Sequence, residues 1–267
     1  MKFATGVLVT GALLTVLTAP AHGFSWITAL SCLLTAGVLT LAVHATETRG
    51  WPLVWTVFTM YGGIGFLNIH IEALFFQILP LATSVRDLLM GLTIAFAASV
   101  LIVFLGGRLP AESTPTVRGL SPRLIQGWTW RAPVAAFSYV VLYFAAGIAV
   151  FPFVQEFYAG KPLPTPGTLI AMQMLRGLVY VAVVFPFVQR MSGQRWRAAW
   201  VLGLAFSVLG GIAPLLLPNN EYLPVNIRVA HAVEIGISNF LFGLAVTMLL
   251  VPRERAHGPR SEVMVHA

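Results

Sequence analysis

Charged residues and cysteine are both scarce in this chain of 267 residues. Asp, Glu, Lys and Arg together make up 9% of the sequence, whereas a soluble domain has about a quarter. Hydrophobic residues amount to 58%, and the mean hydropathy is +0.85. The single cysteine, Cys32, excludes a disulfide framework and a thiolate metal cluster within one chain. The shortage of charge indicates an integral membrane protein rather than a soluble domain.

Long apolar runs, in contrast, are abundant. A helix needs roughly 20 mostly apolar residues to cross hydrocarbon that is about 30 Å thick. Eight runs approach this length, at residues 3–17, 26–43, 52–79, 87–105, 134–154, 168–188, 200–217 and 227–250. We therefore predict an all-α fold, a polytopic transmembrane helical bundle of about eight spanning helices.

The chain is expected to be a single integral membrane domain. Residues 1–106 would hold the first four helices, 107–131 a cytoplasmic linker, 132–252 the last four helices and 253–267 a basic cytoplasmic tail. The motif "GGI" occurs at 62–64 and 210–212, and two further identities keep the same offset of 148 residues. This repetition predicts two degenerate four-helix halves, as in some transporters. The alternative is that glycine pairs recur because they let helices pack closely.

Basic residues are concentrated in alternate connections between the apolar runs. By the positive-inside rule these connections are cytoplasmic, which places both termini in the cytoplasm. The formal charge of +7 then reflects topology and contact with anionic lipid, so the bilayer is the expected partner and nucleic acid is not. Residues 1–21 also fit a cleaved secretory signal, which would leave the remaining topology unchanged. Twelve of the 16 Lys and Arg residues define the pattern: Lys2, Arg49, Arg108, Arg118, Arg123, Arg131, Arg190, Arg195, Arg197, Arg253, Arg255 and Arg260.

Polar residues inside the apolar runs gather in the half predicted to be extracytoplasmic. A charge at the bilayer centre costs at least about 2.5 kcal/mol, so Arg176 should face the interior and pair with Glu72, Glu234 or Asp87. Residues three or four apart share a helix face, which groups these polar side chains into walls of one pocket. The pocket should open outward. Its candidate residues are Asn68, Glu72, Gln173, Arg176, Arg228, His231, Glu234 and Asn239.

Three classes of function are compatible with these residues. In the first, favoured class the protein is a transporter or permease for a small solute or ion: Glu72 and Glu234 exchange protons or cations, Arg176 holds an anionic group and His231 relays a proton. In the second it is a membrane-embedded enzyme or redox protein whose His70 and His231 bind a divalent metal or a haem. In the third it is a noncatalytic assembly factor whose polar residues fix helix register.

Three stretches of the C-terminal half carry a family resemblance. They are "QMLRG" at 173–177, "RWRAAWVLGLAFSVL" at 195–209 and "NNEYLPVNIRVAHAVEIGISNFLFG" at 219–243. In these stretches the chain resembles a group of bacterial multi-pass membrane proteins that has no assigned activity. The resemblance implies a location in the bacterial cytoplasmic membrane. It assigns no catalytic residue.

Overall fold

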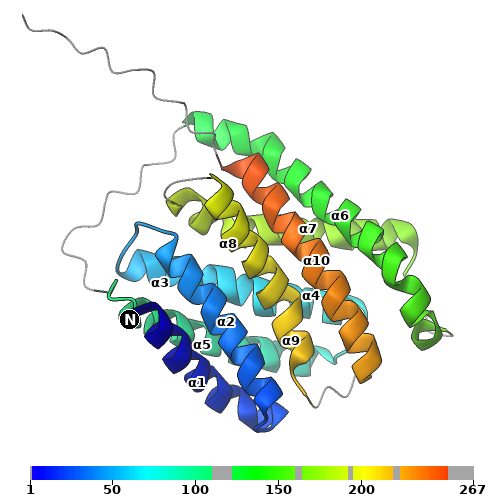
Figure 1. Ribbon diagram of the computed structural model, residues 1–267. Helices are drawn as coiled ribbons and strands as arrows, with labels where there is room; N and C mark the ends of the chain where they lie inside the picture. The colour runs from blue at the N-terminus through cyan, green and yellow to red at the C-terminus, as the bar shows by residue number, and fades with distance from the viewer. Residues whose placement is uncertain (1, 110–121, 160–163, 192–194, 219–222, 252–267) are drawn as a thin grey trace, which may run out of the picture.

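The computed structural model describes residues 2–109, 122–159, 164–191, 195–218 and 223–251, and these residues are almost entirely helical (Figure 1). Two elements are π-helical, η1 and η2. In chain order the elements are α1 (Lys2–His22), α2 (Trp26–His44), α3 (Trp51–Gly62), η1 (Gly63–Leu67), α4 (Asn68–Phe75), α5 (Leu81–Leu105), α6 (Pro122–Tyr158), α7 (Pro166–Arg190), α8 (Arg195–Ser207), η2 (Val208–Ile212), α9 (Ala213–Leu216) and α10 (Val225–Leu250).

These elements make eight spans that are long and apolar enough to cross a membrane, among the residues that are described. The third span consists of α3, η1 and α4 joined end to end, and the seventh consists of α8, η2 and α9. The prediction of an all-α bundle with eight spanning helices is therefore confirmed. The protein is a multi-pass membrane protein.

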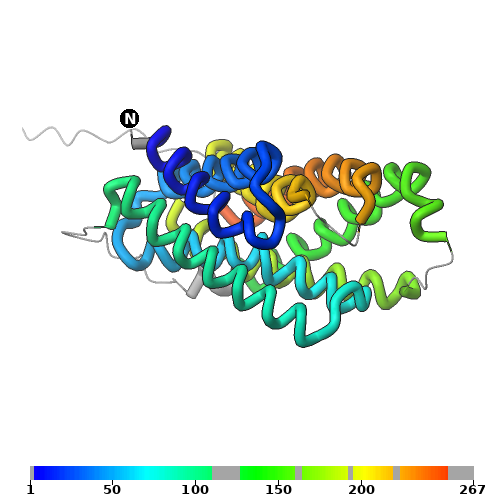
Figure 2. Tube along the Cα trace, turned by 90° about the horizontal axis from the view of Figure 1, so that it is seen from below, coloured from blue at the N-terminus to red at the C-terminus, as the bar shows by residue number. Residues whose placement is uncertain are grey.

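The spans form two rows that lie face to face (Figure 2). One row contains, in order, α1, α2, the span made of α8 and α9, α10 and α6. The other row contains α5, the span made of α3 and α4, and α7. Contacts of α1 with α5 and of α6 with α7 close the two ends of the rows. We call the side of the bundle where α1, α4, α6 and α9 end the far end, and the opposite side the near end.

The two halves of the chain repeat the same pattern of helix contacts. In each half the first span meets the second, the third meets the fourth, and the fourth returns to the first. Between the halves, α3 and α4 contact α7, while α8 and α9 contact α2, so each third span meets the other half's second span. Such reciprocal contacts are those of a two-fold arrangement. They agree with the predicted division into two four-helix halves.

The repeated "GGI" motifs lie at the π-helical interruptions of the third and seventh spans, and η1 and η2 touch. Glycines permit this close approach, because a Cβ on Gly210 would lie 3.2 Å from Ile64 Cγ2 and one on Gly65 would lie 3.4 Å from Leu209 O. Gly63 is also close to α7, since a Cβ there would lie 2.5 Å from the Val183 side chain. Single π turns are often found at functional sites.

The α6 helix begins earlier than the sequence indicates. It starts at Pro122 and runs for 37 residues, so the last part of the expected linker, 122–131, is helical. At about 1.5 Å per residue, this length exceeds what the hydrocarbon requires. Trp128 packs edge-on against Phe185 at 4.3 Å, which fixes the start of α6 against α7. The helix therefore begins inside the stretch 107–131 that was expected to be a cytoplasmic linker.

Arginines at the near end bind the carbonyl ends of helices. Arg197 donates to His44 O at 2.9 Å, and Arg190 donates to Pro186 O at 2.9 Å in the last turn of its own helix. Arg195 donates to Met248 O near the end of α10. Cations are favourable at these helix ends because the last carbonyls have no intrahelical partner.

Candidate functional site

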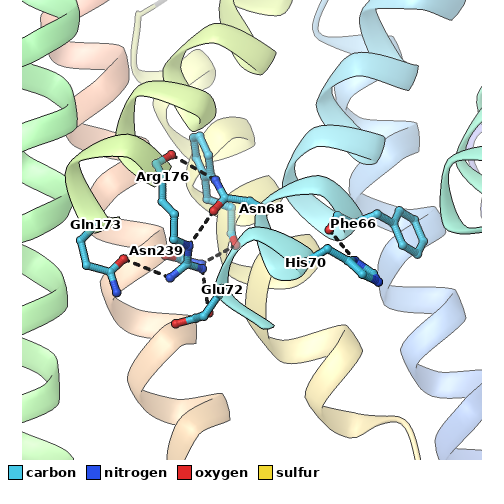
Figure 3. A network of polar contacts seen from close by, with 8 residues as sticks. Phe66, Asn68, His70, Glu72, Gln173, Arg176 and Asn239 are labelled. Atoms are coloured by element: carbon cyan, nitrogen blue, oxygen red, sulfur yellow. Dashed lines mark hydrogen bonds and ion pairs between the residues drawn. The ribbon is translucent and has the colours of Figure 1, made fainter. Parts of the chain in front are cut away.

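Arg176 is the centre of the largest buried polar network that the structure describes. It lies on α7 in the part of the bundle toward the far end, and its residue is only 4% exposed. The Nε atom donates to Asn68 Oδ1 at 2.7 Å, Nη1 donates to Gln173 Oε1 at 3.0 Å, and Nη2 lies 2.9 Å from Glu72 Oε2 (Figure 3). The Gln173 contact was expected from helical spacing, and Glu72 was one of three acids expected to pair with Arg176, whereas the bond from Arg176 to Asn68 was not predicted.

Asn68 holds α4 against α7 in two ways. Its Oδ1 accepts from the Arg176 side chain, while its Nδ2 donates to the Arg176 backbone oxygen at 3.1 Å. Both groups of the amide are therefore engaged by one residue, and Asn68 is fully buried. Glu72, one turn further along α4, has a side chain that is 28% exposed. The network thus has a closed side at Asn68 and a more accessible side at Glu72.

The acid that pairs with Arg176 is Glu72, one of the three candidates. Asp87 instead forms a surface pair with Arg86 on α5, at 3.0 Å, with the Arg86 side chain 68% exposed. Glu234 pairs with His231 on α10. The structure therefore distributes the three acids over three different partners.

Aromatic rings cover the inner side of Arg176. Its guanidinium carbon lies 5.6 Å from the centre of the Tyr139 ring on α6. Tyr139 packs edge-on against Tyr180 at 5.1 Å and against Phe242 at 5.1 Å. A cation over an aromatic face is stabilised further when water is excluded. The cluster separates the network from the apolar core on the near side.

A second polar cluster joins α10 to the end of α6. His231 Nδ1 lies 2.6 Å from Glu234 Oε2, and Tyr158 OH lies 3.1 Å from His231 Nε2. With the proton on Nδ1, the imidazole donates to Glu234 and accepts from Tyr158. The side chains of His231 and Glu234 are 16% and 9% exposed. Sequence reasoning missed Tyr158, because a tyrosine near a span end is also common as an interfacial anchor.

Tyr143 on α6 lies between the two clusters. Glu72, Arg176 and Glu234 are all close enough to act on its hydroxyl electrostatically, and the Gln173 amide lies beside it. Four helices, α4, α6, α7 and α10, therefore contribute to one polar region. No sequence signal distinguished Tyr143 from the many aromatic residues of the apolar runs.

Three further candidate residues, Arg228, Asn239 and His70, bond to backbone oxygens and not to the Arg176 side chain. Arg228 donates to Leu217 O, the residue that caps α9, so it stabilises a helix end instead of lining the pocket. Asn239 donates to Phe206 O at 3.2 Å, next to η2, where a π turn shifts the regular hydrogen-bond ladder. His70 bonds to Phe66 O of its own span at 2.9 Å, and its ring points away from Arg176 (Figure 3).

The two histidines considered as metal ligands have separate surroundings. His70 is turned from the network, whereas the His231 ring is held between Glu234 and Tyr158. Within the described ranges, no group of three or more His, Cys, Asp and Glu side chains could hold a metal ion. The two rings are thus each engaged by partners of their own, His70 on its own span and His231 between α10 and α6.

An apolar groove lies along the α4 and α7 crevice beside the network, with a volume of about 600 Å³. Two of its lining residues, Ile71 and Met172, directly precede Glu72 and Gln173 in the sequence. Thr168 is the one polar side chain among the residues that line the groove. The lining residues are Ile71, Leu74, Phe75, Thr168, Ala171, Met172 and Leu175.

Comparison with protein-family models, with curated proteins and with solved structures found no match to this chain.

Proposed function

We propose that the protein is a transporter or permease for a small solute or ion in the bacterial cytoplasmic membrane. The observation that carries this proposal is the Arg176–Glu72 pair, a buried cation with a partly accessible carboxylate, placed within a membrane span. Ionisable residues inside spans are costly and commonly mark substrate or ion pathways. With both termini cytoplasmic, as the basic residues predict, the polar region opens outward.

The architecture supports the same proposal. Repeated halves with interrupted spans in corresponding positions are the arrangement that transporters use to build a central site. Here the interruptions η1 and η2 touch, and α4, which follows η1, carries Asn68 and Glu72. An interrupted helix also supplies a place where a span can bend.

Each residue has a proposed role. Arg176 holds an anionic group of the solute, with Asn68 and Gln173 fixing the orientation of its guanidinium. Glu72 and Glu234 exchange protons. His231, held between Tyr158 and Glu234, relays a proton toward the far end.

The test is reconstitution into lipid vesicles that contain a pH-sensitive dye. An imposed proton gradient would be followed while panels of small anions, cations and neutral solutes are added. We expect at least one solute to accelerate the collapse of the gradient in the wild type and in Arg86→Gln, but not in Glu72→Gln. Collapse rates equal to those of empty vesicles for every solute would contradict transport.

The orientation has its own test. Reporter fusions at the C-terminus and at the connection between α4 and α5 should report cytoplasmic and extracytoplasmic positions respectively. The opposite result would place the polar region on the cytoplasmic side and reverse the direction of the proposed pathway.

A further inference from the structure

We propose that the site binds an organic monocarboxylate with an apolar body, whose carboxylate replaces Glu72 at Arg176 while Glu72 takes up one proton. This inference rests on the proposed transport function and names its substrate class and its coupling. It follows from the hydrogen-bond donors of the network, the groove beside them and the groups that face Glu72.

The network has donors in excess of acceptors. A guanidinium has five N–H groups, and contacts to Asn68, Gln173 and Glu72 engage three of them. The Gln173 residue is fully buried, and its amide lies beside the Tyr143 hydroxyl, but its Nε2 makes no hydrogen bond of normal geometry to any described residue. A buried donor without an acceptor is destabilising. A ligand that brings acceptor oxygens to Gln173 and Arg176 would remove this cost.

The groove determines the rest of the ligand. It is lined by α4 and α7, the two helices that carry the four network residues. Its walls carry no charged side chain, so a second ionic group would find no partner there. A flat, planar carboxylate matches the fork of an arginine, and an alkyl body matches the apolar walls.

The uptake of a proton follows from the charges around Glu72. Glu72 contacts Arg176 of α7 and lies within electrostatic reach of four tyrosines, Tyr180 of α7 and Tyr139, Tyr143 and Tyr158 of α6. Glu234 of α10 is paired with His231, and on α5 Arg86 and Asp87 pair with each other at the surface. Among the described residues, Arg176 is therefore the one cation that forms an ion pair with Glu72.

A bound carboxylate would form an ion pair with Arg176 in place of Glu72. Glu72 would then lose its counter-ion and lie close to a second negative charge, and both changes favour its protonated form. The balance is one carboxylate and one proton bound together, with Arg176 charged throughout and no net change in charge. Glu234 with His231 provides the adjacent group from which the proton can arrive.

The experiment is calorimetric titration of the purified full chain in nanodiscs with octanoate, acetate and octylammonium. Titration in two buffers of different ionisation enthalpy measures the protons taken up per ligand. We expect octanoate to bind with about one proton taken up. Each methylene of the ligand should tighten binding by roughly three- to fourfold, so acetate should bind far more weakly. Octylammonium should not bind at this site.

Variants connect the binding to the residues. Arg176→Gln should weaken octanoate binding by at least about tenfold, because a charge-assisted pair of hydrogen bonds is lost. Glu72→Gln should still bind octanoate, but proton uptake should fall to near zero. Arg86→Gln, which changes an arginine at the far end of α5, is the matched control and should behave as the wild type.

Ala171→Phe keeps the test valid if Arg176→Gln does not fold. Ala171 lines the groove, is exposed on α7 and is not part of the network. The added ring should weaken octanoate binding without changing the affinity for acetate. Equal loss of both ligands would contradict the placement of the alkyl chain in the groove.

The inference would be overturned by octanoate binding that is insensitive to Arg176→Gln, by equal binding of octylammonium, or by unchanged proton uptake in Glu72→Gln. Two different results separate failure of this substrate class from failure of the proposed transport function. Solute-driven proton flux in vesicles without carboxylate binding would reject the substrate class alone. Carboxylate binding with proton uptake but no flux for any solute would reject transport and leave a ligand-binding site.

Discussion

The two contacts that the repeat places between the halves have very different chemistry. Where α4 meets α7, Arg176 is held by Asn68, Gln173 and Glu72. Where α9 meets α2, Ser31 Oγ donates a single bond to Ala213 O at 2.8 Å. The α4–α7 contact holds a charged polar network, whereas the α2–α9 contact has one neutral bond. The similar helix contacts of the two halves therefore do not extend to the candidate site, which lies at the α4–α7 contact.

The difference begins at the π turns. After η1 the span continues through α4 for eight residues, and after η2 it continues through α9 for only four. Asn68 and Glu72 lie on the longer continuation. The shorter one ends at Leu217, whose carbonyl binds Arg228. The first half thus has an extra turn of helix at the far end on which to carry a site.

The largest effect should come from Arg176→Ala. It leaves the Glu72 carboxylate without its cation, and breaking a buried pair costs about 3–5 kcal/mol. Unfolding in detergent, followed by circular dichroism, measures the loss. In the double mutant with Glu72→Gln, part of this cost should be recovered, with a coupling energy of about 1–3 kcal/mol. Strict additivity of the two changes would show that the pair is not an energetic unit.

Asn68→Ala and Ser31→Ala compare the two interfaces directly. Asn68→Ala removes one bond to the Arg176 guanidinium and one to its backbone, so we expect a loss of about 2–3 kcal/mol. Ser31→Ala removes one neutral bond and should cost about 1 kcal/mol. The same unfolding assay measures both. Equal costs would mean that the polar network adds nothing to the packing of its interface.

Gly63→Ala tests the close approach at η1. The new Cβ would meet Val183 at 2.5 Å, and relieving such an overlap costs about 1–3 kcal/mol. Gly37 on α2 is the matched control, because a Cβ there meets nothing within 4 Å. Gly37→Ala should stabilise the helix by about 0.5–1 kcal/mol. Opposite signs for the two substitutions would confirm that the glycine of the repeated motif has a packing role.

The smallest effect is expected for Asp87→Asn. The Asp87 carboxylate pairs with Arg86 at the surface, and such exposed pairs contribute between about 0 and 1 kcal/mol. Its effect should add to that of Arg176→Ala, since the two sites share no partner. A coupling between Asp87 and Arg176 in the double mutant would show that the choice of Glu72 as partner is wrong.

Much of this arrangement follows from the sequence. Apolar length was enough to locate all eight spans, and helical spacing was enough to group Asn68 with Glu72 and Gln173 with Arg176. Spacing within a helix does not fix the rotation of one helix against another. The choice among three acids for Arg176 therefore depended on tertiary packing.

The π turns explain why the sequence did not predict which faces of the third span meet its neighbours. An extra residue in a turn rotates the following helix by roughly 100° relative to a regular one. The faces of α3 therefore do not continue into α4. Arg228 lies on the same side of α10 as His231 and Glu234, as its spacing predicts. Its side chain nevertheless bonds to the carbonyl of Leu217, which caps α9 and has no partner within that helix.

The double engagement of Arg176 by Asn68, through side chain and backbone, also has a mechanical meaning. Two bonds of Asn68 and the ion pair of Glu72 join α4 to Arg176 on α7. On the other side of the η1–η2 contact, Ser31 bonds to Ala213 O and Arg197 bonds to His44 O, so neutral backbone oxygens take the place of the carboxylate. Any movement of α4 away from α7 must therefore separate an ion pair, a cost that the corresponding movement of α9 away from α2 does not carry.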